Sequence, residues 1–190
     1  MTIGVLALQG AFRAHLSKLK LLGVEAVEVR VPSDLEGVTG LIMPGGESTT
    51  ISKLLESSEL FGPISERIDD GMAVFGTCAG LILLSVNIED GRADQRSFGR
   101  IDIDVQRNGY GSQIESFETA LETSVSEKPF HAVFIRAPRI SRTGPDVEVL
   151  AETRGEPVLV RQGNALGAAF HPELSQDLRI HHLFLESVQD

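Results

Sequence analysis

A sharp turn centred on Cys78, the only cysteine of the chain, most constrains how this sequence can fold. The apolar run at residues 72–75 predicts a short buried strand, and residues 79–84 have the apolar pattern of a helix. Gly76 and Gly80 frame Cys78 in the Gly-x-Cys-x-Gly pattern of a nucleophile elbow, a strained turn that needs small neighbours. The sequence therefore predicts a strand, a tight turn and a helix in direct succession.

The position of Cys78 favours a reactive thiol over a structural one. A lone cysteine is most often a buried structural residue, and that is the alternative here. A free thiol with a pKa of about 8.5 is only a few per cent ionised at pH 7. The unpaired N–H groups at the start of a helix favour the thiolate. With the glycine frame around it, Cys78 is predicted to be a nucleophile.

A base for this thiolate is predicted near the C-terminus, where an apolar segment ends in His171-Pro172-Glu173. In extended backbone, residues two apart point to the same side, and the proline stiffens the link between them. A carboxylate beside an imidazole fixes its tautomer, which is the role of the third member of a triad. The predicted triad is Cys78, His171 and Glu173. The other histidines are predicted to be surface or helix-face residues: His15, His131, His181 and His182.

A third motif lies at Pro44-Gly45-Gly46, where an apolar strand predicted at residues 40–43 ends and a helix capped by Ser and Thr begins. Bare glycines let backbone N–H groups approach a ligand closely. A phosphate-binding loop is disfavoured because its Gly-Lys-Ser/Thr signature is missing. We predict an oxyanion hole formed by the N–H groups of Gly46 and Ala79, with a plain strand-to-helix turn as the alternative.

Composition limits the class of protein. The chain has 190 residues and a net charge of −10, and we expect one domain covering residues 1–190. No basic patch offsets the acidic charge, which argues against a nucleic-acid partner. No apolar run approaches the length of a membrane span, and the pattern of a signal peptide is missing. A single cysteine excludes an internal disulfide and fits a reducing cytoplasm.

Strand and helix signals alternate through the first half of the chain, with strands expected at 2–8 and 24–31 and a helix at 11–22. After Gly91 the signals become short strands, expected at 98–107, 132–135, 147–152, 157–161 and 165–170, before a last helix at 177–188. We predict a flavodoxin-like three-layer α/β sandwich. Its central sheet is mainly parallel, with helices on both faces and a mixed or antiparallel extension.

Taken together, the motifs at 44–48, 76–80 and 171–173 resemble those of class I, or triad, glutamine amidotransferases. A narrower resemblance is to the glutaminase subunits of pyridoxal 5′-phosphate synthase. It rests on Gly-Val-Leu-Ala-Leu-Gln-Gly-Ala at 4–11, Pro-Gly-Gly-Glu-Ser-Thr-Thr at 44–50, Arg107-Asn108 with Gly111-x-Gln113, and Phe-Ile-Arg-Ala-Pro at 134–138. Ala14 and Ser112 stand where this family more usually has a glutamate and an arginine.

The resemblance implies hydrolysis of L-glutamine to glutamate and ammonia through a thioester on Cys78, with no metal or organic cofactor. The substrate-binding residues that it implies are Gly46, Glu47, Ser48, Arg107, Ile135 and Arg136. A guanidinium suits the α-carboxylate of glutamine through a two-pronged contact. The resemblance also implies a (β/α)8 pyridoxal 5′-phosphate synthase subunit as the partner, in a large hetero-oligomer that consumes the ammonia.

Two alternatives remain at this point. One keeps the triad but serves another pathway, such as imidazole or aminobenzoate formation. The other is a flavodoxin-like thiol sensor or chaperone in which Cys78 is oxidised and His171 has no chemical role. Consecutive glycines also permit a peptide flip at Gly45-Gly46, so we expect the isolated chain to be a poor glutaminase until its partner binds.

Overall fold

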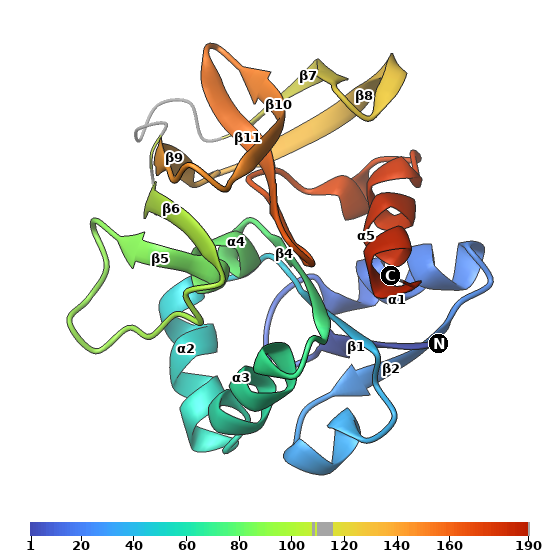
Figure 1. The fold of residues 1–190 in the computed structure, drawn as a ribbon, viewed down its shortest axis with the longest axis vertical. Helices are drawn as coiled ribbons and strands as arrows, with labels where there is room; N and C mark the ends of the chain where they lie inside the picture. The colour runs from blue at the N-terminus through green and yellow to red at the C-terminus, as the bar shows by residue number, and fades with distance from the viewer. Residues whose placement is uncertain (108, 110–115, 190) are drawn as a thin grey trace.

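A computed structural model describes residues 1–107, 109 and 116–189 (Figure 1). Five strands form the parallel part of its main sheet: β1 (Thr2–Leu6), β2 (Glu25–Val29), β3 (Gly40–Met43), β4 (Ala73–Thr77) and β12 (Ala165–Ala168). They lie in the order β2-β1-β3-β4-β12, and each neighbouring pair is parallel. This is the strand order of flavodoxin-like sheets, as predicted.

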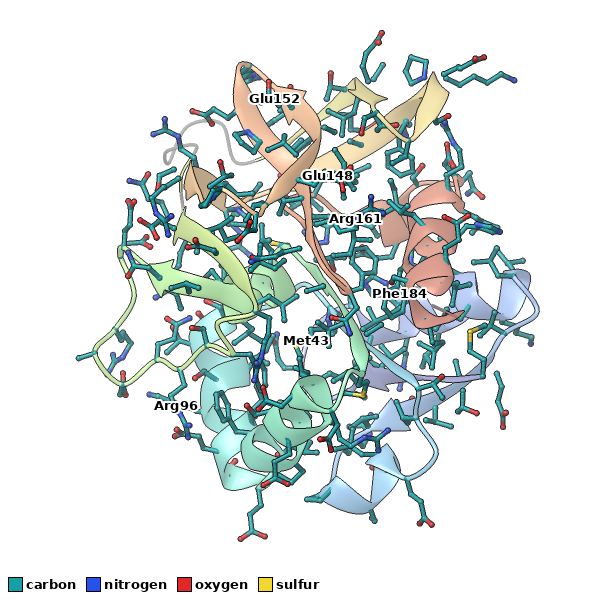
Figure 2. The ribbon with its side chains drawn as sticks, in the orientation of Figure 1. Met43, Arg96, Glu148, Glu152, Arg161 and Phe184 are labelled. Carbon is teal, nitrogen blue, oxygen red and sulfur yellow. The ribbon has the colours of Figure 1, made fainter. Side chains whose placement is uncertain are left out.

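Helices cover both faces of this parallel part. On one face lie α1 (Phe12–Leu21) and α5 (Arg179–Gln189), and on the other lie α2 (Ser48–Ser57), α3 (Phe61–Asp69) and α4 (Ala79–Leu84) (Figure 1). The central strands β3 and β4 are buried along their whole length, which explains why they are almost entirely apolar. Phe184 lies between α5 and the sheet (Figure 2), with its ring 5.6 Å from that of Phe75. The predicted three-layer sandwich is confirmed.

The main sheet continues beyond β12 with antiparallel neighbours. Four strands extend it: β11 (Glu156–Gln162), β10 (Glu148–Thr153), β7 (Ser116–Thr123) and β8 (Ser126–Ile135), in that order. The pairs β12–β11, β11–β10, β10–β7 and β7–β8 are all antiparallel. The predicted mixed extension is therefore present, and β7 is a strand that the sequence pattern did not reveal.

One strand expectation is wrong. Residues 98–107 were expected in the main sheet, but β6 (Ile101–Gln106) lies in a separate small sheet between β5 (Ser85–Ile88) and β9 (Arg139–Thr143). Both edges of β6 are paired there, and its alternate residues are buried. An alternating pattern shows that one face of a strand is buried, but it does not show which sheet the strand joins.

The strand order decides where a site can form. The carboxyl ends of β1, β3, β4 and β12 lie at one edge of the sheet because these strands are parallel neighbours. Binding sites of open α/β sheets lie at this edge. Two 3-10 turns complete the described elements, η1 (Pro32–Leu35) and η2 (Pro172–Leu174). Among the helices in the described ranges, none has the length and apolar content needed to cross a membrane.

Candidate active site

The turn between β4 and α4 has the strained geometry expected of an elbow. Cys78 has φ 50° and ψ −104°, a region that residues with a side chain rarely adopt. A Cβ at Gly76 would lie 2.4 Å from the Gly80 carbonyl oxygen, and one at Gly80 would lie 1.9 Å from the Met43 carbonyl oxygen. Both framing glycines are therefore required by close backbone approach. The helix that follows has only six residues.

His171 and Glu173 lie together, although not in the way that the sequence suggested. β12 ends at Ala168, and Pro172–Leu174 forms the 3-10 turn η2 instead of extended backbone. Proline is well suited to the first position of such a turn because its φ is already helical. His171 Nδ1 lies 2.7 Å from Glu173 Oε1, and both side chains are almost wholly buried. The prediction of extended backbone at residues 171–173 was wrong, but the predicted contact between His171 and Glu173 is present.

The pKa of His171 depends on its two neighbours, Cys78 and Glu173. Burial alone would lower the pKa of His171, but hydrogen bonds and charge from Cys78 and Glu173 raise it to about 10. Burial acts to raise the pKa of Glu173, whereas the hydrogen bond to His171 and nearby positive charge lower it. An imidazolium beside a carboxylate and a thiol is the arrangement that a thiolate nucleophile requires.

The glycine loop after β3 lies directly against these side chains. A Cβ at Gly45 would meet His171 Cε1 at 2.5 Å and the Cys78 Cβ at 3.3 Å. The Ala11 N–H donates to the Gly45 carbonyl oxygen at 3.0 Å. The segment after β1 thus holds one orientation of the peptide that links Gly45 to Gly46.

Gln9 makes a second link between the same two segments. The Glu47 N–H donates to Gln9 Oε1 at 2.9 Å, and a Cβ at Gly46 would lie 2.3 Å from this oxygen. The sequence placed the N-terminal segment at the same edge of the sheet but did not predict these contacts.

A cavity of about 410 Å³ brings the predicted residues together. Its walls contain all of them: Gly46, Glu47, Ser48, Cys78, Ala79, Arg107, Ile135, Arg136, His171 and Glu173. Gln9, Gly10, Ala11, Gly45, Ile82 and Leu174 complete the lining. The cavity is therefore built from segments that are far apart in the sequence and meet at one edge of the sheet.

Arg107 is held at the cavity wall by polar partners. Its Nη2 lies 3.3 Å from Glu47 Oε1 and its Nη1 lies 3.4 Å from Gln95 Oε1. Gln95 also donates to the Ser48 hydroxyl at 3.0 Å. No motif in the sequence marks Gln95, because it lies in a loop and acts only through these long-range contacts.

Glu47 has a second task as the N-cap of α2. Its carboxylate accepts from the N–H groups of Thr49 and Thr50 at 3.1 Å and 2.7 Å. Partial burial would raise the pKa of Glu47, but these hydrogen bonds, together with that from the Thr50 hydroxyl, lower it. The residue is thus held as a carboxylate at the mouth of the cavity.

Arg136 follows β8 and has φ 44°, which is uncommon for a residue other than glycine. It is exposed and lines the cavity next to Ile135, whose carbonyl oxygen lies 4.0 Å from Cys78 Sγ. Strained backbone at the wall of a cavity is frequent in functional sites.

Two of the histidines expected to be surface or helix-face residues lie on buried helix faces and not at the surface. His15 and His181 are both completely buried, and His15 Nε2 lies 3.4 Å from Glu173 Oε2. The physical reason is visible in the helix pattern, because His15 shares one face of α1 with Phe12 and Leu19. This stripe was the signal that could have revealed it. His131 and His182 are exposed, as predicted.

Part of the family pattern lies outside the described residues, namely Asn108, Gly111, Ser112 and Gln113. Ala14, the other departure from that pattern, is half-buried on α1 and does not line the cavity. Within the ranges that the structure describes, no group of three or more His, Cys, Asp or Glu side chains is arranged to hold a metal ion.

Comparison with known proteins decides the family. The model of the SNO glutamine amidotransferase family matches residues 5–190. The chain belongs to this family. The pyridoxal 5′-phosphate synthase subunit PdxT of Moorella thermoacetica is 52% identical over 189 residues, covering 99% of this chain and all of that protein. The protein of the same name from Nocardioides sp. is 50% identical over 194 residues, covering 100% of this chain and 96% of that protein.

Solved structures agree with this assignment. A crystal structure of a glutamine amidotransferase has a TM-score of 0.93 and 49% identity, and the match covers 99% of each chain. The resemblance noted from the motifs is therefore confirmed at the level of the family and the fold. Membership of a glutamine amidotransferase family removes the thiol-sensor alternative.

Proposed function

We propose that this chain hydrolyses L-glutamine to L-glutamate and ammonia with Cys78, His171 and Glu173 as its catalytic triad. The ammonia passes to a pyridoxal 5′-phosphate synthase subunit. The main support for this proposal is that the three side chains and the Gly45-Gly46 loop line the same cavity. The names of relatives about half identical to this chain support the same pathway.

In the first half of the reaction the thiolate of Cys78 attacks the side-chain amide carbon of glutamine. The carbonyl oxygen becomes an oxyanion, which the N–H groups of Gly46 and Ala79 stabilise. Each such donor typically contributes about 2.7–4 kcal/mol to lowering the barrier. His171 then gives its proton to the leaving nitrogen, and the C–N bond breaks to release ammonia and leave a thioester.

In the second half water attacks the thioester. Neutral His171 accepts a proton from the water, and a second oxyanion forms in the same place. Collapse of this intermediate breaks the C–S bond, releases glutamate and restores the thiolate–imidazolium pair. Glu173 keeps His171 in the tautomer that both steps need, because its Oε1 accepts from Nδ1.

The proposed substrate contacts follow from charge. Arg107 and Arg136 offer guanidinium groups to the α-carboxylate of glutamine, and Glu47 offers a carboxylate to its α-ammonium group. Gly46, Ser48 and Ile135 supply the remaining wall around the substrate. Arg107 would exchange its contact with Glu47 for the substrate carboxylate on binding.

The proposal includes the setting of the reaction. Residues 1–190 act as one glutaminase domain, and the partner is a (β/α)8 synthase subunit in a large hetero-oligomer. A nucleophile that must stay a free thiol works best in a reducing compartment, which supports a cytoplasmic location.

The test combines turnover with covalent trapping. Ammonia release from glutamine is measured with and without a synthase subunit of the proposed kind. A glutamine-like diazoketone is then added, and the intact mass is determined. One adduct, located on Cys78 and prevented by glutamine, is expected. Ammonia release without any adduct on Cys78 would exclude this residue as the nucleophile.

A further inference from the structure

Behind the predicted triad lie two buried histidines that the mechanism does not use: His15, which approaches Glu173, and His181, which contacts His15. His15 comes from α1 and His181 from α5, and neither lines the cavity. We propose that His15 is a positioning residue, whose Nε2–H holds one oxygen of the Glu173 carboxylate while the other oxygen holds His171. This inference rests on the proposed glutaminase function and adds a fourth residue that acts through Glu173.

The two oxygens of Glu173 are in different situations. Oε1 makes the 2.7 Å hydrogen bond to His171 Nδ1. Oε2 is buried without a hydrogen bond of ordinary geometry in the described part of the chain, and His15 Nε2 approaches it at 3.4 Å. A buried carboxylate oxygen without a donor is unfavourable, and catalytic hydrogen bonds that are long in an empty site often shorten in the substrate complex. His15 Nε2 is the group placed to satisfy Oε2.

The neighbours of His15 decide which ring nitrogen carries the proton. Nε2 lies 3.2 Å from Thr77 Oγ1 and 3.4 Å from Glu173 Oε2, and Nδ1 lies 3.0 Å from His181 Nε2. An ionised carboxylate only accepts hydrogen bonds, so an unprotonated Nε2 would face it lone pair to lone pair. A proton on Nε2 removes this repulsion, and Nδ1 then accepts from His181.

The second ring nitrogen of His181, Nδ1, also indicates that His181 donates to His15. Its Nδ1 is buried and has no hydrogen-bond partner among the residues that the structure describes. Orphaned buried N–H groups are rare, so this nitrogen is better left unprotonated. The proton of His181 is then on Nε2, where it is donated to His15 Nδ1. The chain of contacts therefore runs from His181 through His15 and Glu173 to His171.

Burial favours the neutral form of both rings. The groups that face them are Glu173 and His171, Thr77 from β4, and Lys18 from α1, whose Nζ donates to the Ser175 carbonyl oxygen at 2.5 Å. Burial lowers the pKa of His15 against the opposing effect of the Glu173 charge. Burial lowers the pKa of His181 to about 3, and a proton added to His15 would act in the same direction.

Removing the Nε2–H donor of His15 should change the protonation of Glu173. Without it the protonated carboxyl is favoured, so Glu173 is neutralised at a higher pH and orients His171 less well. We expect kcat to fall by roughly 10- to 100-fold, as for a lost hydrogen bond to a buried charge. KM should change little because His15 does not line the cavity. The acidic limb of the pH profile of kcat/KM should move to higher pH.

The experiment compares three substitutions of His15 with two controls. In His15→Gln the amide nitrogen reaches the position of Nε2, in His15→Asn it reaches only that of Nδ1, and His15→Leu has no donor. Thr77→Val removes the competing acceptor, and His182→Leu alters an exposed histidine of α5. Ammonia release with the synthase subunit is measured across pH, and every His15 variant is also made in a Glu173→Gln background. Thermal unfolding checks that each variant folds.

The expected result is a large loss in His15→Leu and His15→Asn, recovery in His15→Gln and no loss in Thr77→Val. In the Glu173→Gln background the His15 substitutions should add nothing further. Equal losses in both backgrounds, or an unmoved acidic limb, would overturn the proposal. If His15→Leu does not fold, the contrast between His15→Asn and His15→Gln decides.

Alkylation of Cys78 by iodoacetamide across the same pH range separates this proposal from the proposed function. It reports the pairing of Cys78 with His171 and needs no glutamine. A parent chain that releases no ammonia would overturn the glutaminase function. The His15 proposal would then stand or fall on whether His15→Asn shifts the alkylation profile and His15→Gln does not.

Discussion

At the scale of single residues, the backbone of Cys78 is strained, as the proposed nucleophile elbow requires. The φ of 50° places a side chain where glycine alone is comfortable. Such strain persists only where the surrounding structure enforces it. The tight frame of Gly76 and Gly80 supplies that enforcement.

Two substitutions separate the chemical role of Cys78 from its strain. Cys78→Ala should fold and bind glutamine but retain no more than a few per cent of the ammonia release. Cys78→Gly should be equally inactive, yet more stable than Cys78→Ala by about 1 kcal/mol because the strain is relieved. Denaturant unfolding measures the difference. Ala14→Gly on α1 is the control and should have the opposite sign.

The predicted base and its partner should differ in importance. His171→Asn should lose nearly as much activity as Cys78→Ala, because members of a triad act as a unit. Glu173→Gln should lose less, since Glu173 orients His171 and transfers no proton. Initial rates of ammonia release with the synthase subunit measure both. Turnover of His171→Asn within about tenfold of the parent would show that another base is used.

Stability should depend on pH in opposite directions for these two residues. The folded pKa of His171 is raised to about 10, so its contribution is complete below about 6.5 and lost as the pH rises through 10. The folded pKa of Glu173 is lowered, so its contribution is complete above about 4.5 and lost in more acidic solution.

The difference in unfolding free energy between the parent and His171→Asn should therefore shrink from pH 7 to pH 10. The corresponding difference for Glu173→Gln should shrink as the pH falls below about 4.5. Denaturant unfolding at fixed pH values tests both trends. His131→Asn alters an exposed histidine and should change stability by less than about 0.5 kcal/mol.

At the scale of elements, the segment after β1 holds the glycine loop after β3. Gly10 has φ +99°, and a Cβ there would lie 1.9 Å from the Gly45 carbonyl oxygen. Gly71 has the same φ, but a Cβ there would meet nothing within 4 Å. Gly71 is therefore a control for Gly10, because the two residues have the same φ but only Gly10 touches the glycine loop.

Gly71→Ala should lower stability by about 1 kcal/mol through the unfavourable φ, and Gly10→Ala should lower it further because its Cβ also clashes with the Gly45 carbonyl oxygen. Only Gly10→Ala should also displace the glycine loop, and it should lose roughly 100-fold in ammonia release if one oxyanion donor is misplaced. Thermal unfolding and initial rates with the synthase subunit measure the two effects. Equal activity in the two variants would show that the loop does not depend on this contact.

At the scale of the whole molecule, the cavity lies at an edge of the sheet where a partner can reach the loops that form it. The Gly45-Gly46 peptide is held in one orientation by Ala11, and a partner that contacts residues 9–11 can change this orientation. A partner shifts the equilibrium only through contacts that are better in the active state.

The isolated chain should therefore release ammonia roughly 10²- to 10³-fold more slowly than the chain saturated with synthase subunit, as expected for one missing oxyanion donor. Steady-state rates in the two conditions measure this ratio. Equal rates would mean that the oxyanion hole is complete without the partner, and would leave the triad assignment intact.

The local features of this protein could be predicted from the amino-acid sequence. The elbow around Cys78, the Gly45-Gly46 turn and the His171–Glu173 pair were all predicted, because each depends on residues that are close in the chain. Alternating strand and helix signals also predicted the parallel sheet, since a parallel crossover needs a connecting helix.

The contacts between groups that are far apart in the sequence could be found only from the fold. The sequence did not show that β6 joins a separate sheet, that Gln95 contacts Arg107, or that His15 is buried against Glu173. These facts depend on how helices and strands pack, and an amphipathic pattern identifies a buried face without naming what covers it. The proposed triad was therefore predictable from the chain, whereas the residues packed around it were not.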